Sequence, residues 1–221
     1  MAVSPFWLSL KLAFWTTVLL IPVGLMIGRL RAYSKFRGRV WLEALVYLPL
    51  VLPPTVLGYY LLVVLSPNNV IGKSLAALFD GPLVFSFEAL VLASLIANLP
   101  FAVQPSQQAF AAISQDTREA AWVSGLSSWR TFYLIELPQC MLGVLCAATL
   151  TFAHTMGEFG VVLMVGGNIA GETRTLSIAI YDSVQSFDMS TAGAMTLGLL
   201  LFSIVALVIV RTAGLQHNRE R

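Results

Sequence analysis

Ionisable side chains within apolar sequence are the residues best suited to chemistry in this chain. His154 and Glu158 lie four residues apart in a long apolar stretch, so they share one face if that stretch is a helix. A carboxylate there is costly to bury and indicates a functional role, so we expect Glu158 to face the interior of a helix bundle. Two such side chains do not complete a metal site. We therefore expect His154 to be neutral and hydrogen-bonded, and we predict no metal centre.

Three prolines interrupt a second apolar stretch, Leu48–Tyr60. They remove backbone donors and must kink or break the helix, which a membrane tolerates where the freed groups face protein or a water-filled cavity. The alternative is a kink that serves packing without touching a substrate. The pore or gate candidates from the two stretches are Pro53, Pro54, Thr55, Gly157, Glu158, Phe159 and Gly160. We expect Glu158 to form a hydrogen bond in a gate with Thr55, or with that residue of a second subunit.

The composition excludes several classes of protein. Hydrophobic residues make up 57% of the 221 residues and charged residues 11%, whereas soluble domains carry about 25% charged residues. A secreted disulfide scaffold, a disordered chain and a soluble nucleic-acid-binding protein are excluded, and a net charge of +2 gives no reason to expect a nucleic-acid partner. Cys140 and Cys146 stand on different faces of one helix, so we expect small buried residues and no disulfide.

Five stretches with few charges are long enough to cross about 30 Å of hydrocarbon as helices. We expect spans at about 6–28, 43–65, 84–103, 134–165 and 189–210. The sequence therefore predicts an all-α integral membrane protein, a five-helix transmembrane bundle that forms one domain over residues 1–221, surrounded by membrane lipid.

Basic residues set the expected orientation of these spans, because Lys and Arg are enriched in cytoplasmic connections. Ten of the 13 basic residues fall in the first and third connections and the tail, and only Lys11, Lys73 and Arg174 fall on the other side. The N-terminus is then outside and the C-terminus inside. The five basic residues of the first connection would also suit an exit funnel for an anion, but orientation already accounts for them.

The third connection contains a short polar segment with helix signals. Asp116 is an expected N-cap with Glu119 three residues later as in a capping box, and Gly125 is an expected end. A second helix start is expected at Ser127 or Ser128. The residues alone predict a helix at about 114–125 on the cytoplasmic surface, for which an amphipathic connector at the lipid headgroups is an open alternative.

The same segment contains a longer spaced pattern, E-A-A, three residues, G, nine residues, I-x-L-P. Its seven specified positions are Glu119, Ala120, Ala121, Gly125, Ile135, Leu137 and Pro138. The pattern resembles the signature of the membrane subunits of binding-protein-dependent ABC importers. The resemblance implies a type I importer permease whose helix at 114–125, the coupling helix, docks into a cleft on a separate ATPase subunit.

The resemblance also implies the partners. They are two copies of an ABC ATPase subunit, a second copy of this chain in a homodimer, and an extracytoplasmic binding protein. The chain contains no G-x-x-x-x-G-K-[ST] loop, so we expect it to bind no cofactor and not to be an enzyme, with ATP and magnesium held by the ATPase subunit.

Two segments bear on the substrate. The segments P-L-V-L-P-P-T-V-L-G-Y-Y-L-L and G-E-F-G-V-V-L-M-V-G-G-N-I-A-G-E-T-R-T are similar to those of molybdate permease subunits of the bacterial inner membrane. The likeness implies a pore for the molybdate oxyanion, fed by a molybdate-binding protein. Sulfate, thiosulfate or tungstate permeases are the alternatives on substrate.

Two other classes of protein remain as rivals. A stand-alone secondary transporter would need ligands for a coupling ion, and only His154 and Glu158 offer themselves. A membrane enzyme would need a cluster of Asp, His or Ser at one depth, which the sequence lacks.

In the outer connection, Leu176, Ile180 and Val184 recur every four residues and predict a short helix, which would either dock the binding protein or cap the pore mouth.

Overall fold

The computed structural model describes residues 4–34, 37–79 and 81–219, and for residues 209–211 and 213–219 it describes the backbone only. The described residues form helices joined by turns and loops, without a strand. Lys35 and Arg221, which were counted among the basic residues above, lie outside the described residues.

The elements in chain order are α1 (Pro5–Tyr33), α2 (Arg39–Val51), α3 (Pro54–Leu65), α4 (Val70–Leu78), α5 (Phe87–Ala111), α6 (Gln115–Val123), α7 (Ser128–Thr131), the π-helical turn η1 (Phe132–Glu136), α8 (Leu137–Gln139), α9 (Met141–Gly157), α10 (Gly160–Gly166), α11 (Leu176–Gln185) and α12 (Met189–Arg219).

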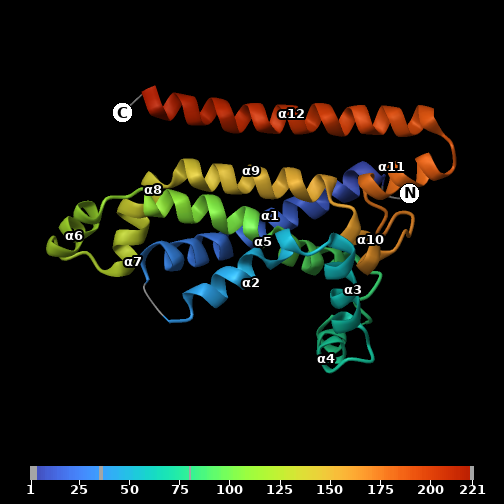
Figure 1. Cartoon of the computed structure of the whole chain (residues 1–221), viewed down its shortest axis with the longest axis horizontal. Coiled ribbons are helices and arrows are strands. Elements are labelled where there is room, and N and C mark those ends of the chain that lie inside the picture. Colours follow the sequence, from blue (N-terminus) through green and yellow to red (C-terminus); the bar gives the residue numbers. More distant parts are fainter. Residues whose placement is uncertain (1–3, 35–36, 80, 220–221) are drawn as a thin grey trace.

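Three long helices, α1, α5 and α9, pack side by side and form the centre of the bundle, while α12 lies along α9 (Figure 1). Half of the most apolar window of α5 is buried inside the protein, against 6% for α12. The central helix is thus α5, and the Met189–Val208 part of α12 presents almost its whole surface outward. Its apolar outer face suits lipid or another apolar surface.

Small residues allow α1 and α5 to approach closely. A Cβ built on Gly24 would lie 2.7 Å from Cβ of Ala102, and one built on Gly28 would lie 2.8 Å from the backbone nitrogen of Gln107. The two glycines are four residues apart, as in the small-xxx-small packing motif of membrane helices. Any larger side chain at either position would push the two helices apart.

Helices long and apolar enough to cross a membrane number three among the described residues, or up to five if each of two bent pairs counts as one span. The single helices are α1, α5 and the Met189–Val208 part of α12. One bent pair is α2 with α3, at 112°, and the other is Ser128–Gln139 with α9, at 73°. The predicted break at the prolines is confirmed, because α2 ends at Val51 and α3 begins at Pro54.

The stretch 134–165 was expected to be one span, and the structure divides it. The helical course bends around Cys140, and α9 ends at Gly157, after which Glu158 adopts an extended backbone and α10 begins at Gly160. The glycines on either side of Glu158 favour such an interruption, since glycine is a poor helix former. His154 and Glu158 therefore do not share one continuous helix.

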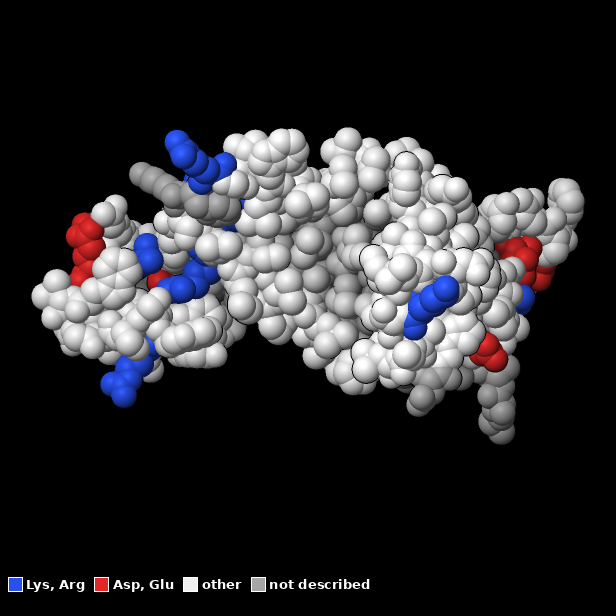
Figure 2. All heavy atoms as spheres, turned by 90° about the horizontal axis from the view of Figure 1, so that it is seen from below, with Lys and Arg blue, Asp and Glu red and all other residues white. Residues whose placement is uncertain are grey.

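The two ends of the bundle differ. Figure 1 shows α6 and α7 beyond one end, and α11 with the N-terminus at the other. On the face drawn in Figure 2, Lys and Arg gather over the end that carries α6, and a band without charged side chains separates this end from the opposite one. Such a band is what an apolar bilayer requires.

Candidate functional site

The helix α6 begins and ends at defined caps. Ser114 is the N-cap, and its Oγ accepts from the backbone nitrogen of Thr117 at 3.3 Å. The expectation of Asp116 as N-cap is therefore wrong, since Asp116 lies in the first turn, where its charge still suits the helix dipole. Glu119 does not complete a capping box, and it accepts from Nε2 of Gln115 at 2.6 Å.

Gly125 ends this helix, as expected. Its φ is +80°, and the backbone nitrogens of Gly125 and Leu126 donate to the carbonyls of Trp122 (2.9 Å) and Ala121 (3.1 Å). These two bonds form a Schellman motif, which favours glycine because other residues are strained at positive φ. The following helix, α7, is capped by Ser127, one of the two expected starts.

One face of α6 is exposed and is not covered by the described residues of this chain. Glu119 and Ala120 are exposed, whereas Ala121 is the one buried residue of the helix. The later positions of the spaced pattern lie apart from α6. Ile135 and Leu137 are partly buried, in η1 and at the start of α8, and Pro138 is exposed. The exposed face of α6 can therefore meet another protein.

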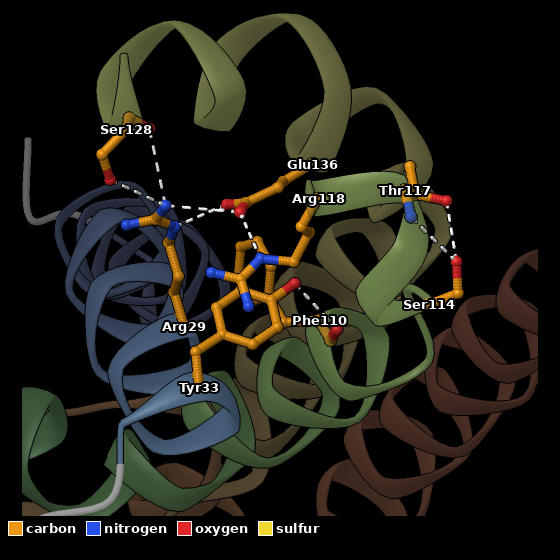
Figure 3. Close-up of polar contacts among 8 residues, drawn as sticks. All are labelled: Arg29, Tyr33, Phe110, Ser114, Thr117, Arg118, Ser128 and Glu136. Carbon is orange, nitrogen blue, oxygen red and sulfur yellow. Dashed lines mark hydrogen bonds and ion pairs between the residues drawn. The ribbon is translucent and has the colours of Figure 1, made fainter. Parts of the chain in front are cut away.

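A buried carboxylate lies under α6, and the sequence analysis missed it. Glu136 is 0% exposed and pairs with two arginines (Figure 3). Arg29 of α1 donates from Nε to Oε2 at 2.5 Å and from Nη2 to Oε1 at 3.3 Å. Arg118 of α6 donates from Nε to Oε1 at 3.1 Å, and its guanidinium lies 3.4 Å from the ring centre of Tyr33.

The pore and gate candidates meet around a cavity of about 560 Å³ at the other structural break. Its lining includes Pro54 and Thr55 from the start of α3, the segment Gly157–Gly160, and Phe101 and His154 from α5 and α9. Pro53 is not part of this lining and forms the cap of α3. The two interrupted stretches are thus brought to one cavity, although the sequence predicted an interruption only in the proline stretch.

Asn98 of α5 joins the two ionisable residues at this cavity. Its Nδ2 donates to Oε2 of Glu158 at 3.0 Å and to the carbonyl of Ser94 at 2.9 Å, while its Oδ1 lies 2.9 Å from Nδ1 of His154. Because both amide hydrogens are used, Oδ1 accepts from the protonated Nδ1 of His154. The ring of His154 stacks on Phe101, with centroids 4.2 Å apart.

The partner of Glu158 differs from the one expected within the chain. Glu158 is buried and bonds to Asn98, whereas Thr55 is exposed at the cavity. Glu158 still faces the interior, as predicted, but its donor comes from the central helix. A bond to Thr55 of a second subunit stays a prediction.

Cys140 is buried as expected, whereas Cys146 is only partly buried, and the helix expected around Ile180 is present as α11. Cys140 and Cys146 are both free, and Cys140 packs against Phe110 and Ile113. The helix α11 covers residues Leu176–Gln185, and Ser177 Oγ donates to the carbonyl of Glu158 at 2.5 Å. The helix α11 is therefore attached to the break that lines the cavity.

The chain matches a known family of transport proteins over most of its length. Residues 20–219 match the family model described as the binding-protein-dependent transport system inner membrane component. The chain belongs to this family. Its apolar helices and this membership make it a multi-pass permease of the bacterial inner membrane.

The permease is similar to transport subunits of two kinds. It is 46% identical to the molybdenum transport system permease protein ModB of Azotobacter vinelandii over 90% of this chain and 88% of that one. It is 30% identical to the sulfate transport system permease protein CysT of Escherichia coli strain K12, over 99% of this chain and 78% of that one. Among solved structures, a bacterial ABC transporter involved in alginate import gives a TM-score of 0.71 at 18% identity, covering 97% of this chain and 78% of that chain. This last likeness shows the fold.

Sequence reasoning missed the two side chains that organise these sites in the permease. Glu136 occupies the unspecified position of I-x-L-P, and Asn98 is a neutral residue within an apolar span. A carboxylate between Ile135 and Leu137 was a detectable signal, since an acidic residue among apolar ones needs a partner. Nothing in the sequence indicated that the partners would be Arg29 and Arg118.

Proposed function

We propose that this permease is the pore-forming subunit of an ATP-driven importer for the molybdate oxyanion. The observation that carries the proposal is its 46% identity to a ModB protein along nearly the whole chain, against 30% to a sulfate permease. Sulfate or thiosulfate is the second candidate substrate, because the sulfate permeases also align along the whole chain. Tungstate is the third, because its size and charge are nearly those of molybdate.

In this proposal the permease acts as a homodimer with five spans in each copy, N-terminus outside and C-terminus inside. Two copies of an ATPase subunit, which hold ATP and magnesium, dock on the cytoplasmic side. The coupling helix, α6, supports this arrangement, since its exposed face carries Glu119 and Ala120 and is free to enter a cleft. An extracytoplasmic molybdate-binding protein delivers the ion near α11. The permease itself holds no nucleotide.

The pore in this proposal passes the cavity lined by Thr55 and Gly157–Gly160. A carboxylate repels an oxyanion, so Glu158 serves the gate and not the ion. Its bond to Asn98 turns one carboxylate oxygen toward a donor on α5. Glu158→Gln and Thr55→Val should therefore change the transport rate or the basal ATP hydrolysis, and unchanged values in both variants would contradict the gate.

The test is uptake of labelled molybdate at sub-micromolar concentration in cells that lack their own permease and express this chain with a molybdate-type ATPase and binding protein. We expect saturable uptake that survives excess sulfate and requires the ATPase subunit. Glu119→Lys should abolish it, whereas Glu88→Lys, the same charge reversal on an exposed residue far from α6, should not. Loss of uptake to sulfate would favour a sulfate permease. Uptake without the ATPase subunit would refute an ABC importer.

A further inference from the structure

The attachment of α6 to the rest of the permease is polar. Ala121 is the only residue of this helix that is buried, so α6 contributes almost nothing to a hydrophobic core. Among the described ion pairs, the one that joins α6 to another element is Arg118 with Glu136, at 3.1 Å. The guanidinium carbon of Arg118 also lies 3.4 Å from the ring centre of Tyr33 and 4.9 Å from that of Trp122.

Glu136 brings three distant parts of the chain to one carboxylate. Arg29 comes from the end of α1, Arg118 from α6, and Glu136 itself from the turn η1 that leads through α8 into α9. Arg29 also donates to Oγ of Ser128 at 3.3 Å, which ties the start of α7 to the same point. Figure 3 shows these side chains converging between the ends of the helices.

The chemistry of this cluster makes it stiff. Both oxygens of Glu136 are occupied, and the guanidinium of Arg29 binds them in a forked geometry, which fixes orientation as well as distance. Two cations share one carboxylate that is withdrawn from solvent, so separating Arg118 from Glu136 breaks a charge-assisted bond, and losing both arginines would leave the carboxylate buried and unpaired. A displacement of α6 must therefore carry Glu136 and Arg29 with it, and through them α9 and α1.

We propose that Glu136 is the positioning residue that transmits movement of α6 to the membrane helices, with Arg118 as the link on α6 and Arg29 as the link on α1. This inference rests on the proposed function, because it assigns to the cluster the step between ATP hydrolysis in the partner and opening of the pore. It adds a role for three side chains that the E-A-A signature does not specify.

The first measurement compares molybdate uptake with ATP hydrolysis in proteoliposomes that contain the whole complex. Arg118→Met puts an uncharged apolar chain beside Tyr33 in place of the guanidinium and leaves Glu136 paired with Arg29, so the permease should still fold and assemble. We expect the ratio of uptake to hydrolysis to fall about tenfold, as the loss of one charge-assisted bond allows. Arg118→Lys should restore part of the ratio, and Glu136→Gln should lower it at least as far as Arg118→Met.

Glu43→Gln is the matched control. Glu43 of α2 pairs with Arg31 of α1 at 2.7 Å, an Arg–Glu pair near the same end of α1 that does not involve α6. The ratio of uptake to hydrolysis in Glu43→Gln should stay near that of the unaltered permease. An unchanged ratio in Arg118→Met and Glu136→Gln would overturn the inference. So would failure of Arg118→Met to copurify with the ATPase subunit, since Arg118 would then serve docking.

A second measurement tests the link between Arg118 and α6 and does not depend on which ion the permease carries. Hydrogen exchange of the permease alone should show the amides of α6 exchanging about tenfold faster in Arg118→Met, with those of α11 unchanged. Equal exchange of α6 in both proteins would overturn the inference. Absence of ATP-dependent uptake by the unaltered permease would instead count against the proposed function, so the two failures are distinguishable.

Discussion

Replacing Gly28 by alanine should weaken the packing of α1 on α5, because the added Cβ has no space. It would lie 2.8 Å from the backbone nitrogen of Gln107, 2.9 Å from Cβ of Ser106 and 3.1 Å from the carbonyl carbon of Ser106. Non-bonded heavy atoms are best separated by about 3.5–4.0 Å. Two of these three neighbours are backbone atoms of the central helix, so relief requires the two helices to separate.

The size of the effect follows from two opposing terms. Overpacking of this kind costs about 1–3 kcal/mol. Alanine in a helix is favoured over glycine by about 1 kcal/mol, so the net destabilisation by Gly28→Ala is smaller than the clash. Gly198→Ala on α12 provides the same helix gain with no atom within 4 Å of the new Cβ. The difference between the two variants therefore isolates the clash, roughly 5- to 150-fold in the unfolding equilibrium constant.

The assay is reversible unfolding in mixed micelles with increasing dodecyl sulfate, followed by the fluorescence of the five tryptophans. We expect Gly198→Ala to be neutral or stabilising and Gly28→Ala to unfold at a lower detergent fraction. Gly24→Ala should behave like Gly28→Ala, because its Cβ would lie 2.8 Å from the carbonyl oxygen of Ala102. Equal midpoints for Gly28→Ala and Gly198→Ala would refute the reasoning.

Three further changes test the sites. Asn98→Ala leaves Glu158 without its side-chain donor, so the free energy of unfolding should fall by about 1–3 kcal/mol in the same assay, while Asn68→Ala on the surface should have no effect. Gly125→Ala strains a residue at positive φ by about 1–2 kcal/mol, so it should reduce copurification of the ATPase subunit more than Gly125→Asn does, and equal losses would contradict this cause. Ser114→Ala removes the N-cap of α6, worth about 1 kcal/mol, and amide exchange in the first turn should quicken; an unchanged rate would mean that the cap contributes nothing.

Local signals in the sequence predicted local structure well. The caps at Ser127 and Gly125, the break before Pro54 and the helix around Ile180 all depend on residues within a few positions of one another. The N-cap of α6 was misassigned because Ser114 and Asp116 are both good caps, and propensity does not decide which turn comes first. The break at Glu158 was missed because an apolar stretch of 32 residues reads as one span when only composition is considered.

The sequence did not predict contacts between residues that are distant along the chain. The convergence of Arg29, Arg118 and Glu136 depends on how three helices end at one side of the bundle, which periodicity does not specify. Asn98 shows the same limit, because its side chain has a purpose only once α5 is placed beside the break between α9 and α10. The packing of the spans decides which side chains meet, and this packing depends on all the helices together, so no local pattern in the sequence specifies it.

The two breaks that border the cavity differ in mechanical character. At Leu52–Pro53 the bend of 112° adjoins proline, whose ring fixes φ and restricts the residue before it, so this side behaves as a rigid wall. At Glu158 the break is flanked by Gly157 and Gly160, and a Cβ built on Gly160 would lie 2.7 Å from Cβ of Pro54. The two breaks thus meet at a contact that is too close for any side chain at position 160. The start of α10 therefore cannot approach the start of α3 any further, and only sliding or separation of the two is open to it.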